Sequence, residues 1–487
     1  MGESLILNIT KGLKSFLVVS CLFLVCSIPF LNAQTATFEI SGAVEGFFPT
    51  LLEPERYMGI AFTNTTDFEV SIELKAFDSH GELITGRDIL NPATLRVLPR
   101  GQTWASVGDD FGAGILSEDV GKISYQSNRA ALATLFLIGD EKNMLLDGGT
   151  AGQTPLKTFV FPSISREGEE PFTTIHLFNP SAESNLEVEL TLYDLAGTVV
   201  GSRTVTLLPQ GVIVQDVTVL FGLDPAIFSG GYVRGTAEGD GVVALETFGN
   251  EQSLNLLAAQ PLSLNERSYW IPHFAVGGGF DTELTLINTD SSRSATLRVM
   301  ALDDQGDPRL NPVQVSLGPL EQGIFNLSTL FGISNDQQIV GSLRIDLEND
   351  LLDSSSEPAS VNGSLRLKSS DGRLSASLPL LLPLDADAFY AHIAQDLGFF
   401  TGVAVLNPHR DPVEVRVEAF DQVGDQLGEN TFTLPGGGRK AKLLMELIPA
   451  TAGQVGGYFR VRGAREIVSF ALFGDLASES ISIIPSQ

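Results

Sequence analysis

One skeleton of short motifs recurs four times along the chain, and this repetition constrains the fold more than any other feature. In each copy, an apolar segment ends at an asparagine, which is Asn64, Asn179, Asn288 or Asn407. Fourteen or fifteen residues later each copy carries Asp-x-x-Gly, and these pairs are Asp78 and Gly81, Asp194 and Gly197, Asp303 and Gly306, and Asp421 and Gly424. The recurrence predicts four structurally equivalent repeats.

Further landmarks follow in the same order. Three copies continue with Leu-Pro, at Leu98-Pro99, Leu208-Pro209 and Leu434-Pro435, and the third copy has Leu317-Gly318-Pro319. Phe-Gly then recurs at 111–112, 221–222 and 331–332, and Ile448-Pro449 stands in its place in the fourth copy. A glycine opens the next apolar segment at 121, 231 and 457, and in the third copy either Gly341 or Gly363 fits this position.

The apolar segments have the period of β-strands. Residues 70–77, 187–193, 296–299 and 413–420 alternate apolar and polar side chains, which is typical of antiparallel sheets with one buried face. Asp-x-x-Gly suits a hairpin turn, because Asp can bond to its own backbone and Gly tolerates a positive φ. The recurrent asparagine is expected to cap a turn at the end of a strand. The only helical turns expected are those before Phe221 and Phe331.

About seven short strands fit each copy, which predicts an all-β fold of four tandem antiparallel β-sandwich (Ig-like) domains. The expected boundaries are 34–152, 156–264, 267–384 and 387–487, with an acidic insertion at 346–360 in the third domain. The linkers are short, at about 152–157, 265–268 and 384–388, and they favour a stiff string of domains.

Residues 1–33 have the features of a secretory signal peptide. Lys11 and Lys14 precede an apolar run over 16–31, and Ala33 is the expected cleavage site. The alternatives are an uncleaved membrane anchor, for which this run is short, and a lipoprotein signal at Cys21. Both cysteines, Cys21 and Cys26, lie in this segment, so the mature chain can form neither disulfides nor thiolate metal sites.

Composition excludes several classes of function. The 487 residues include 59 acidic and 30 basic residues, which gives a net charge of −29. This charge argues against binding to nucleic acids or to anionic membranes. Hydrophobic residues make up 43% of the chain, so the chain is long and apolar enough to bury several cores.

No catalytic constellation stands out. The five histidines are His80, His176, His273, His392 and His409, and they lack partner ligands at fixed spacing. The nucleophile elbow, the zinc-binding helix motif and the phosphate loop are all missing from the sequence. We therefore expect no enzymatic activity. The alternative is a secreted hydrolase, or an accessory subunit of an envelope enzyme complex, whose paired carboxylates come from distant segments.

Calcium is the one cofactor for which the sequence offers candidate ligands. Asp346, Glu348, Asp350 and Asp353 supply carboxylates within the acidic insertion, and carboxylate oxygens are the ligands that Ca²⁺ prefers. The run lacks the regular Asp-x-Asp-x-Asp-Gly loop. The alternative interpretation is a solvated surface insertion that binds no cation.

The order of Asn-Pro, alternating strand, Asp-x-x-Gly, Leu-Pro, Phe-Gly and Gly-Tyr resembles bacterial secreted tandem β-sandwich (Ig-like) repeat proteins. The shared motifs are turn and core residues, so the resemblance implies fold and export rather than an activity. We expect an extracellular, cell-surface or periplasmic protein without a transmembrane span in its mature chain. Its expected role is that of a structural, adhesion or binding module, whose partner would be an extracellular or envelope protein or a polysaccharide.

Overall fold

The structure is a computed structural model that describes residues 44–487 apart from short gaps. The gaps fall at 50–55, 113, 116–118, 130–131, 141–146, 153, 165–172, 225–227, 229, 251–252, 263–265, 335–336, 349–358, 384, 397 and 476–479. The proposed signal peptide at 1–33 and most of the acidic insertion therefore lie outside the described residues. Among the residues described, no helix is long and apolar enough to cross a membrane.

Four consecutive segments of the chain, named repeats 1 to 4, each form strands of two antiparallel sheets. Repeat 1 contains β1 (Val44–Pro49), β2 (Arg56–Asn64), β3 (Val70–Phe77), β4 (Ala93–Val97), β5 (Gln102–Ser106), α2 (Val107–Asp110), β6 (Lys122–Ser127), β7 (Leu132–Asp140) and β8 (Asp147–Gly149). Repeat 2 contains β9 (Thr158–Ile164), β10 (Thr174–Phe178), β11 (Leu186–Asp194), β12 (Val199–Leu207), β13 (Val212–Asp216), α3 (Val217–Phe221), β14 (Gly231–Ala237), β15 (Val243–Asn250), β16 (Ser253–Ala258) and β17 (Gln260–Pro261).

The third and fourth repeats follow a similar order of elements. Repeat 3 contains β18 (Ser268–Val276), β19 (Phe280–Asn288), β20 (Ala295–Leu302), β21 (Val313–Leu317), β22 (Gln322–Asn326), α4 (Leu327–Phe331), β23 (Ile339–Leu347), β24 (Val361–Ser369) and β25 (Ser375–Pro379). Repeat 4 contains β26 (Asp385–Tyr390), β27 (Phe399–Leu406), β28 (Val413–Phe420), β29 (Gln426–Leu434), β30 (Arg439–Leu443), α5 (Leu444–Leu447), η2 (Pro449–Thr451), β31 (Tyr458–Asp475) and β32 (Ile481–Pro485).

Strand order is the same in every repeat. One sheet, which we call the rim sheet, has the order β1-β6-β3-β4, β9-β14-β11-β12 or β18-β23-β20-β21, and in repeat 2 the short strand β17 adds to its edge beside β9. The other, the hub sheet, has the order β5-β2-β7-β8, β13-β10-β15-β16 or β22-β19-β24-β25. Repeat 4 follows the same plan, except that the long strand β31 serves both of its sheets. The prediction of an all-β fold built from antiparallel sheets is confirmed.

The distribution of strands between the two sheets agrees with that of immunoglobulin domains in part and differs from it in part. The second and fifth strands share one sheet and the third and sixth share the other, as in immunoglobulin domains. Here the first and fourth strands join the rim sheet and the seventh joins the hub sheet. In constant-type immunoglobulin domains, the first and fourth strands lie with the second and fifth, and the seventh lies with the third and sixth.

Several local predictions can be compared with these elements. The helical turns expected before Phe221 and Phe331 are confirmed as α3 and α4, whereas α2 and α5 were not expected.

The structure also identifies the opening glycine of repeat 3. Gly341 lies on the rim strand β23, directly before the residue that pairs with Leu302, while Gly363 lies on the hub strand β24.

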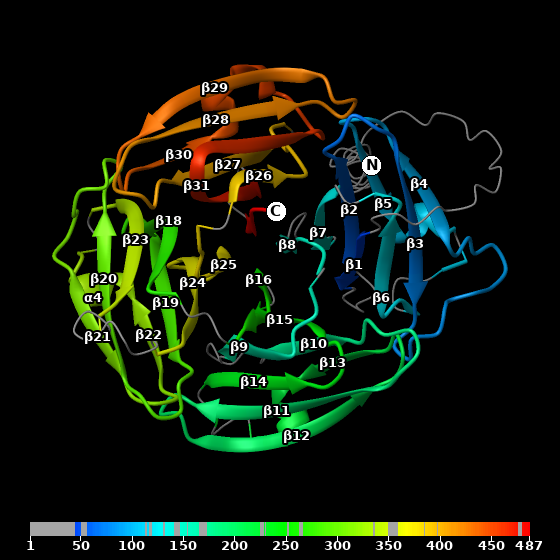
Figure 1. The fold of residues 1–487 in the computed structure, drawn as a ribbon, viewed down its shortest axis with the longest axis horizontal. Helices are drawn as coiled ribbons and strands as arrows, with labels where there is room; N and C mark the ends of the chain where they lie inside the picture. Colours follow the sequence, from blue (N-terminus) through cyan, green and yellow to red (C-terminus); the bar gives the residue numbers. More distant parts are fainter. Residues whose placement is uncertain are drawn as a thin grey trace, which may run out of the picture.

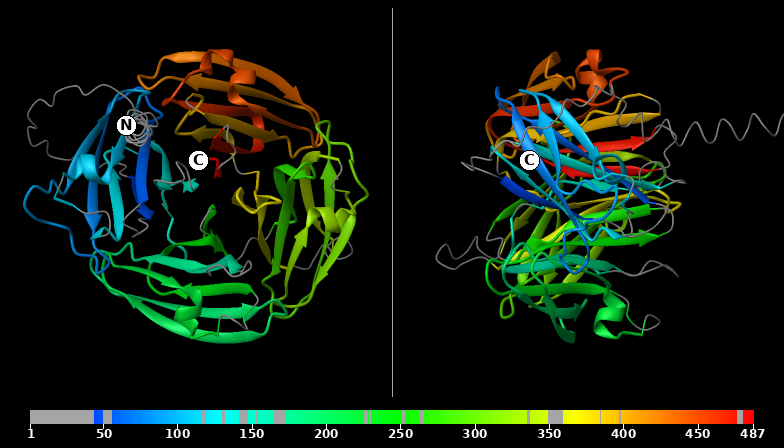
Figure 2. Two further views of the ribbon diagram at one scale, coloured as in Figure 1. Left: turned by 180° about the vertical axis from the view of Figure 1, so that it is seen from behind. Right: turned by 90° about the vertical axis from the view of Figure 1, so that its right-hand side faces the viewer.

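The four repeats form a closed ring, and the stiff string expected from the short linkers is wrong. Figure 1 shows the repeats around a common axis, with β12, β21 and β29 at the periphery and β8, β16 and β25 near the centre. The last strands of the hub sheets contact one another in a cycle, from β8 to β16, β25, β32 and back to β8. Figure 2 shows the same ring from the back and from the side.

The apolar core follows this arrangement. Four large buried clusters correspond to the four repeats, and smaller clusters lie between neighbouring repeats. The cluster of repeat 4 also includes Ala133, Leu135 and Leu137 of repeat 1. The cluster of repeat 3 includes Ile481 and Ile483 of repeat 4. Burial across the contacts between repeats therefore stabilises the ring as a whole.

Candidate functional site

The four recurrent asparagines lie where a hub strand ends, and all four are buried. The side-chain Nδ2 of each donates to the Leu-Pro-type turn of its own repeat, at Leu98 O (2.9 Å), Leu208 O (2.8 Å), Gly318 O (2.8 Å) and Pro435 O (2.9 Å). Each Oδ1 accepts from the main-chain N–H two residues later, at 2.9–3.1 Å. One side chain thus fixes two loops of its repeat.

The Asp-x-x-Gly segments form tight hairpins on the rim sheet. The Oδ1 atom of each aspartate accepts from the main-chain N–H four residues later, at Glu82, Thr198, Asp307 and Asp425. The closing glycines have φ between 80° and 91°, a region that favours glycine. Local chain geometry is therefore one reason for the residue types in this motif.

Each hairpin also touches the Leu-Pro-type turn of the next repeat. A Cβ atom added to the hairpin glycine would lie 2.1 Å from Pro209 O, 2.6 Å from Leu320 O, 2.3 Å from Gly436 O or 2.6 Å from Arg100 O. A main-chain hydrogen bond joins the same two turns at every contact, and these bonds are Val212 N to Ser79 O (3.0 Å), Gln322 N to Leu195 O (2.9 Å), Arg439 N to Asp304 O (3.1 Å) and Gln102 N to Gln422 O (2.9 Å). We call these four contacts the junctions 1–2, 2–3, 3–4 and 4–1.

Junction 4–1 closes the ring without a covalent link, and it repeats the contacts of the other three. Gln102 of repeat 1 reaches into repeat 4, where its Nε2 donates to Ala391 O and to Gly457 O (2.8 Å). Its Oε1 accepts from Gly457 N at 2.8 Å. The recurrent residues of repeats 1 and 4 therefore meet as those of consecutive repeats do.

Each of the other junctions has its own polar anchor. At junction 1–2, Lys122 Nζ donates to Gln210 Oε1 at 2.8 Å, and burial lowers the pKa of Lys122 to about 7. At junction 2–3, Tyr232 OH donates to Leu320 O at 2.8 Å. At junction 3–4, the buried Arg439 donates from Nη1 to Gly341 O at 2.6 Å.

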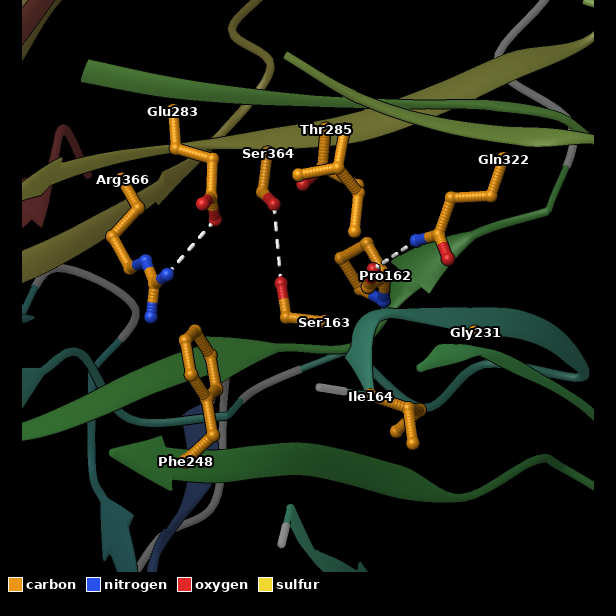
Figure 3. Close-up of a pocket in the computed structure, with 11 residues that line it drawn as sticks. Pro162, Ser163, Ile164, Gly231, Phe248, Glu283, Thr285, Gln322, Ser364 and Arg366 are labelled. Carbon is orange, nitrogen blue, oxygen red and sulfur yellow. Dashed lines mark hydrogen bonds and ion pairs between the residues drawn. The ribbon is translucent and has the colours of Figure 1, made fainter. Parts of the chain in front are cut away.

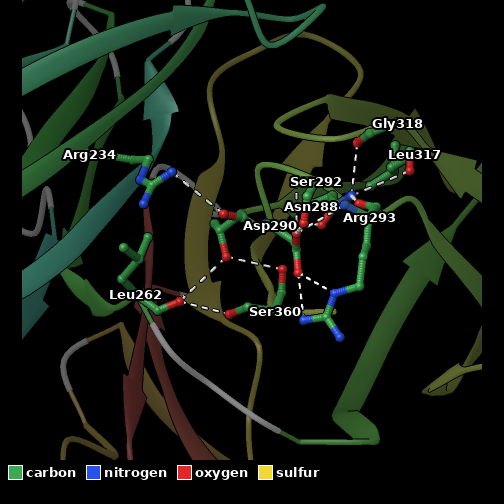
Figure 4. A network of polar contacts seen from close by, with 10 residues as sticks. Arg234, Leu262, Asn288, Asp290, Ser292, Arg293, Leu317, Gly318 and Ser360 are labelled. Carbon is green, nitrogen blue, oxygen red and sulfur yellow. Dashed lines mark hydrogen bonds and ion pairs between the residues drawn. The ribbon is translucent and has the colours of Figure 1, made fainter. Parts of the chain in front are cut away.

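Figure 4 shows the polar contacts that surround junction 2–3. Arg234 Nη1 of repeat 2 reaches Thr289 O of repeat 3 at 3.5 Å, directly beside Asn288. Leu262 O, directly after β17, accepts from Ser360 Oγ at 2.8 Å and from Thr289 Oγ1 at 3.4 Å, both in repeat 3. Leu262 N donates to Thr158 O of repeat 2 at 3.2 Å, so Leu262 is held against both repeats.

A polar network lies at the centre of the ring. Asp147 of β8 accepts from Ser482 Oγ (2.7 Å), from Leu256 N (2.6 Å) and from Gly148 N (2.8 Å), so it joins repeats 1, 2 and 4. Burial raises the pKa of Asp147 to about 7, although these three hydrogen bonds act to lower it. Asn255 Oδ1 likewise accepts from two serines of β25 and joins repeats 2 and 3.

A small polar cavity lies between repeats 2 and 3, as Figure 3 shows. Its volume is about 10 Å³, enough for about one water molecule. Ser163 Oγ and Ser364 Oγ face each other across it at 3.2 Å. Glu283 forms ion pairs with Arg366 (3.0 Å) and with Lys368 (2.9 Å) beside it.

Two carboxylates at this junction have opposite pKa shifts. Burial raises the pKa of Glu246 to about 8, against the hydrogen bond that Ser163 N donates to it. For Glu283, the nearby Arg366 and Lys368 outweigh burial and lower the pKa. Such a pair is a pattern seen in acid–base catalysis, but the cavity beside Glu283 is too small for a sugar or a peptide.

The five histidines lie in separate places. His80 lies in an exposed hairpin, His176 contacts Thr247 Oγ1, His273 accepts from Arg439, His392 is buried in repeat 4, and His409 contacts Glu466 O. Burial lowers the pKa of His176 and of His273 to about 3 and that of His392 to about 4, which makes all three neutral at pH 7. The structure therefore assembles no histidine site from them.

The candidate calcium ligands are described only in part. Asp346 Oδ1 accepts from Ser268 Oγ (2.6 Å) and from Arg344 Nε (2.8 Å), and Glu348 accepts from Gln314. Asp350 and Asp353 lie outside the described residues. Within the described part of the chain, no group of three or more acidic, histidine or cysteine side chains is arranged to hold a metal ion.

Sequence reasoning missed the residues that anchor the junctions, such as Gln102, Lys122 and Arg439, and the central Asp147. One signal was available for two of them. Gln102 and Arg439 follow the Leu-Pro-type turn directly, at a position equivalent to Val212 and Gln322. Residue type varies at this position, so a search for recurrent letters does not find it.

Comparisons with known proteins add little. No protein-family model matches the chain, and no curated protein matches it. Dimeric latent PorU from Porphyromonas gingivalis is 10% identical over 73% of this chain, with a TM-score of 0.14, and the chain covers 32% of the PorU chain. A glycoside hydrolase of family 32 from Bifidobacterium adolescentis is 9% identical over 88% of this chain and 99% of its own, also with a TM-score of 0.14. Scores this low carry no argument about fold or function.

Proposed function

We propose that this protein is an exported, non-enzymatic scaffold of the cell envelope or the extracellular space, and that it acts as a structural, adhesion or binding module. The observation that carries this proposal is the use of the recurrent residues. The hairpins and the turns that recur four times meet at the junctions, and each recurrent asparagine holds the turn of its own repeat in place. The motifs that recur in this chain therefore serve the assembly of the ring, and none of them is a reactive group.

The finer description of the fold belongs to the same proposal. Each repeat is a β-sandwich of Ig-like type in which the first, fourth and seventh strands have changed sheets, and the repeats descend from one duplicated unit. Export depends on the segment 1–33, with cleavage after Ala33. The absence of cysteine after Cys26 is compatible with this destination, because the junctions supply the cross-links that disulfides provide in many exported domains.

The proposed partner is an extracellular or envelope protein or a polysaccharide. A ring of four repeats presents several copies of similar loops, and loops carried on a rigid scaffold are common recognition sites. The net charge of −29 keeps such a scaffold soluble and disfavours anionic partners.

Expression of the full chain in a bacterial host tests the proposal. We expect a mature chain that begins at Gln34 in the periplasm or the medium, measured by intact mass. The purified protein should retain an envelope component in a pull-down and should leave polysaccharide, peptide and ester panels unchanged. A chain kept in the cytoplasm at full length would contradict export, and reproducible turnover would contradict the non-enzymatic role.

A secreted hydrolase is the second candidate. The opposite pKa shifts of Glu246 and Glu283 are a pattern found in acid–base catalysis, but a sugar or a peptide could reach these groups only if junction 2–3 opened, because the cavity there is too small. The test is the same panel of substrates with Glu246→Gln and Glu283→Gln. Turnover that either substitution abolishes, in variants that melt as the wild type does, would establish the hydrolase. Turnover unaffected by both substitutions would exclude these carboxylates.

A further inference from the structure

Junction 1–2 contains the one fully buried lysine among the described residues. Lys122 lies at the start of β6, directly after the opening glycine of repeat 1, and its side chain is 0% exposed. The residues that follow the opening glycines of the other repeats are Tyr232, Ser342 and Tyr458. Tyr232 anchors junction 2–3 without an amino group, so packing against the next repeat does not by itself require a lysine here.

The amino group of Lys122 lies in aromatic surroundings. Its Nζ atom is 4.9 Å from the centre of the Phe47 ring and 5.1 Å from the centre of the Phe77 ring. Within the described part of the chain, no carboxylate forms an ion pair with it. Burial lowers the pKa of Lys122 to about 7, although Glu45 acts to raise it. A large fraction of the protein therefore carries a neutral amino group at this position at pH 7, and a neutral amine is a nucleophile.

The carboxamide of Gln210, in repeat 2, lies against this amino group. Lys122 Nζ donates to Gln210 Oε1 at 2.8 Å and to Asn179 O at 3.4 Å. Gln210 Nε2 donates to Pro180 O at 2.7 Å, so both polar atoms of the carboxamide are held in place. Because a carbonyl bond is about 1.23 Å long, Cδ of Gln210 lies within about 4 Å of Nζ. Reacting atoms in a near-attack arrangement are about 3–3.5 Å apart, so a small rotation of either side chain brings the two atoms into contact.

We propose that Lys122 and Gln210 form an isopeptide bond that joins repeats 1 and 2 covalently. The lone pair of the neutral Nζ attacks Cδ of Gln210, and the π electrons of the carbonyl move to Oε1. When the carbonyl forms again, the bond between Cδ and Nε2 breaks, and Nε2 leaves as ammonia with one proton that Nζ gives up. The reaction needs no oxidant and no second reactant. Glu45, whose carboxyl group interacts electrostatically with Lys122 and has a raised pKa, is a described group that can carry this proton.

Contact between a lysine and a side-chain carbonyl group is not sufficient for this chemistry. Lys368 Nζ lies 2.9 Å from Glu283 Oε2, but the lysine side chain is 23% exposed and Glu283 also pairs with Arg366. Neighbouring cations lower the pKa of Glu283, and an ionised carboxylate is a poor electrophile. We therefore expect no bond between Lys368 and Glu283, and this pair is the matched control within the same chain.

Mass spectrometry of a tryptic digest of the purified, folded mature protein tests the proposal. Trypsin does not cut after a lysine in an amide bond, so we expect one product in which residues 101–129 are joined to residues 204–234. It should be lighter than the two separate peptides by one molecule of ammonia, and Lys368 should remain free. The mass of the whole protein is less informative, because a chain that begins at Gln34 also loses ammonia when that residue cyclises. Recovery of unmodified Lys122 and Gln210 from protein kept for several days at pH 8 would overturn the proposal.

Variants provide a second measurement. Lys122→Arg keeps a cationic hydrogen-bond donor of similar length, but its guanidinium stays charged and cannot form the amide. We expect the joined product to be lost in Lys122→Arg and in Gln210→Met and to persist in Gln314→Met, at an exposed position. Denatured wild-type protein should also migrate faster in gel electrophoresis than denatured Lys122→Arg, because its closed loop keeps the chain more compact. Equal mobility of the two denatured chains, or a joined product that persists in Lys122→Arg, would contradict the proposal.

The bond would close a loop from residue 122 to residue 210 in a chain that has no cysteine after Cys26. It would hold junction 1–2 together even where the hydrogen bonds of that junction open. The inference rests on the contacts of Lys122 alone, and it does not depend on whether the protein acts as a scaffold or as an enzyme.

Discussion

The asparagines at 64, 179, 288 and 407 are buried, although asparagine is a residue type that mostly stays on the surface. Burial of an amide is costly unless its donors and acceptor are satisfied. The Nδ2 of each lies within hydrogen-bonding distance of three carbonyl oxygens of the loops around it. The Oδ1 of each accepts from one main-chain N–H. Aspartate has no N–H to donate, and serine is too short to span the two loops, so the position selects asparagine.

Asn288→Ala is expected to lower the free energy of unfolding by about 2–3 kcal/mol, because it removes the hydrogen bonds from the buried Nδ2 to Arg293 O and to Gly318 O. Urea unfolding of the variant measures this change. Asn185→Ala, at an exposed position, is the matched control and should change the value by less than about 0.5 kcal/mol. Equal losses of unfolding free energy in the two variants would show that the buried amide contributes no more to stability than the exposed one.

The ionisation of Asp147 should make the ring more stable in acid than in base over part of the pH range. Its pKa in the folded protein is about 7, above its ordinary value of 3.8, so the folded chain binds the proton more tightly. The resulting stability is fully present below pH 4 and is lost as pH rises to 7. The pKa of Glu246 is also raised, from 4.5 to about 8, so its contribution to stability is likewise lost as pH rises.

Asp147→Asn isolates this contribution, because an amide cannot ionise. The amide oxygen can still accept from Leu256 N, and the amide NH₂ can donate to Ser482 Oγ. We expect the difference in unfolding free energy between variant and wild type to move in favour of the variant as pH rises from 4 to 8. The change should amount to a few kcal/mol. A difference that stays constant over this range would contradict the assignment of the shift to Asp147.

At the scale of elements, the hairpins of the rim sheet act as connectors between repeats. A hairpin that faced only solvent would need a glycine for its φ angle and nothing more. Gly197 also lies against Leu320 of the next repeat, where an added Cβ atom would come within 2.6 Å of the carbonyl oxygen. The turn is therefore constrained by two neighbours, the chain itself and the adjoining repeat.

Gly197→Ala should consequently cost more stability than an alanine at a free turn. Gly239 is the matched control, since it also has a positive φ of 58° and no atom within 4 Å of an added Cβ. We expect about 1–2 kcal/mol for Gly239→Ala from backbone strain alone, and clearly more for Gly197→Ala, measured by urea unfolding. Equal losses would mean that the hairpin does not dock on repeat 3 in solution.

The elements were predictable to different degrees. The strands at 70–77, 187–193 and 413–420 follow from their period of two, because one buried face imposes that pattern on each of them. The helical turn α2 was missed, since four residues carry too little periodicity to be recognised. The sheet to which the first and seventh strands belong cannot be read from alternation, which is the same in either sheet.

At the scale of the whole molecule, the ring was the feature that sequence reasoning could not reach. The recurrent residues at and beside the junctions are Asn, Asp, Gly and Pro, and the same residue types serve isolated surface turns. Short linkers are equally compatible with a string and with a ring. One available signal for the ring was that Asp-x-x-Gly and the Leu-Pro-type turn recur together in all four copies. A turn that faced only solvent would not need to keep the same residues in every copy.

The contacts that close the ring at junction 4–1 should contribute to the free energy of unfolding. If the ring is closed, Gln102→Ala removes bonds to Ala391 and to both main-chain groups of Gly457, and we expect a loss of about 2–3 kcal/mol. Gln305→Ala, on an exposed hairpin, serves as the control with a loss of less than about 0.5 kcal/mol. A silent Gln102→Ala would indicate that repeats 1 and 4 are apart in solution.

The shape of the mature protein in solution tests the central claim most directly, and small-angle X-ray scattering measures it. A closed ring of this length should have a radius of gyration of about 23 Å, the value for a compact body, and a single maximum in its distribution of interatomic distances. A radius of gyration about twice as large, with distances that extend to four sandwiches laid end to end, would contradict the ring and restore the string.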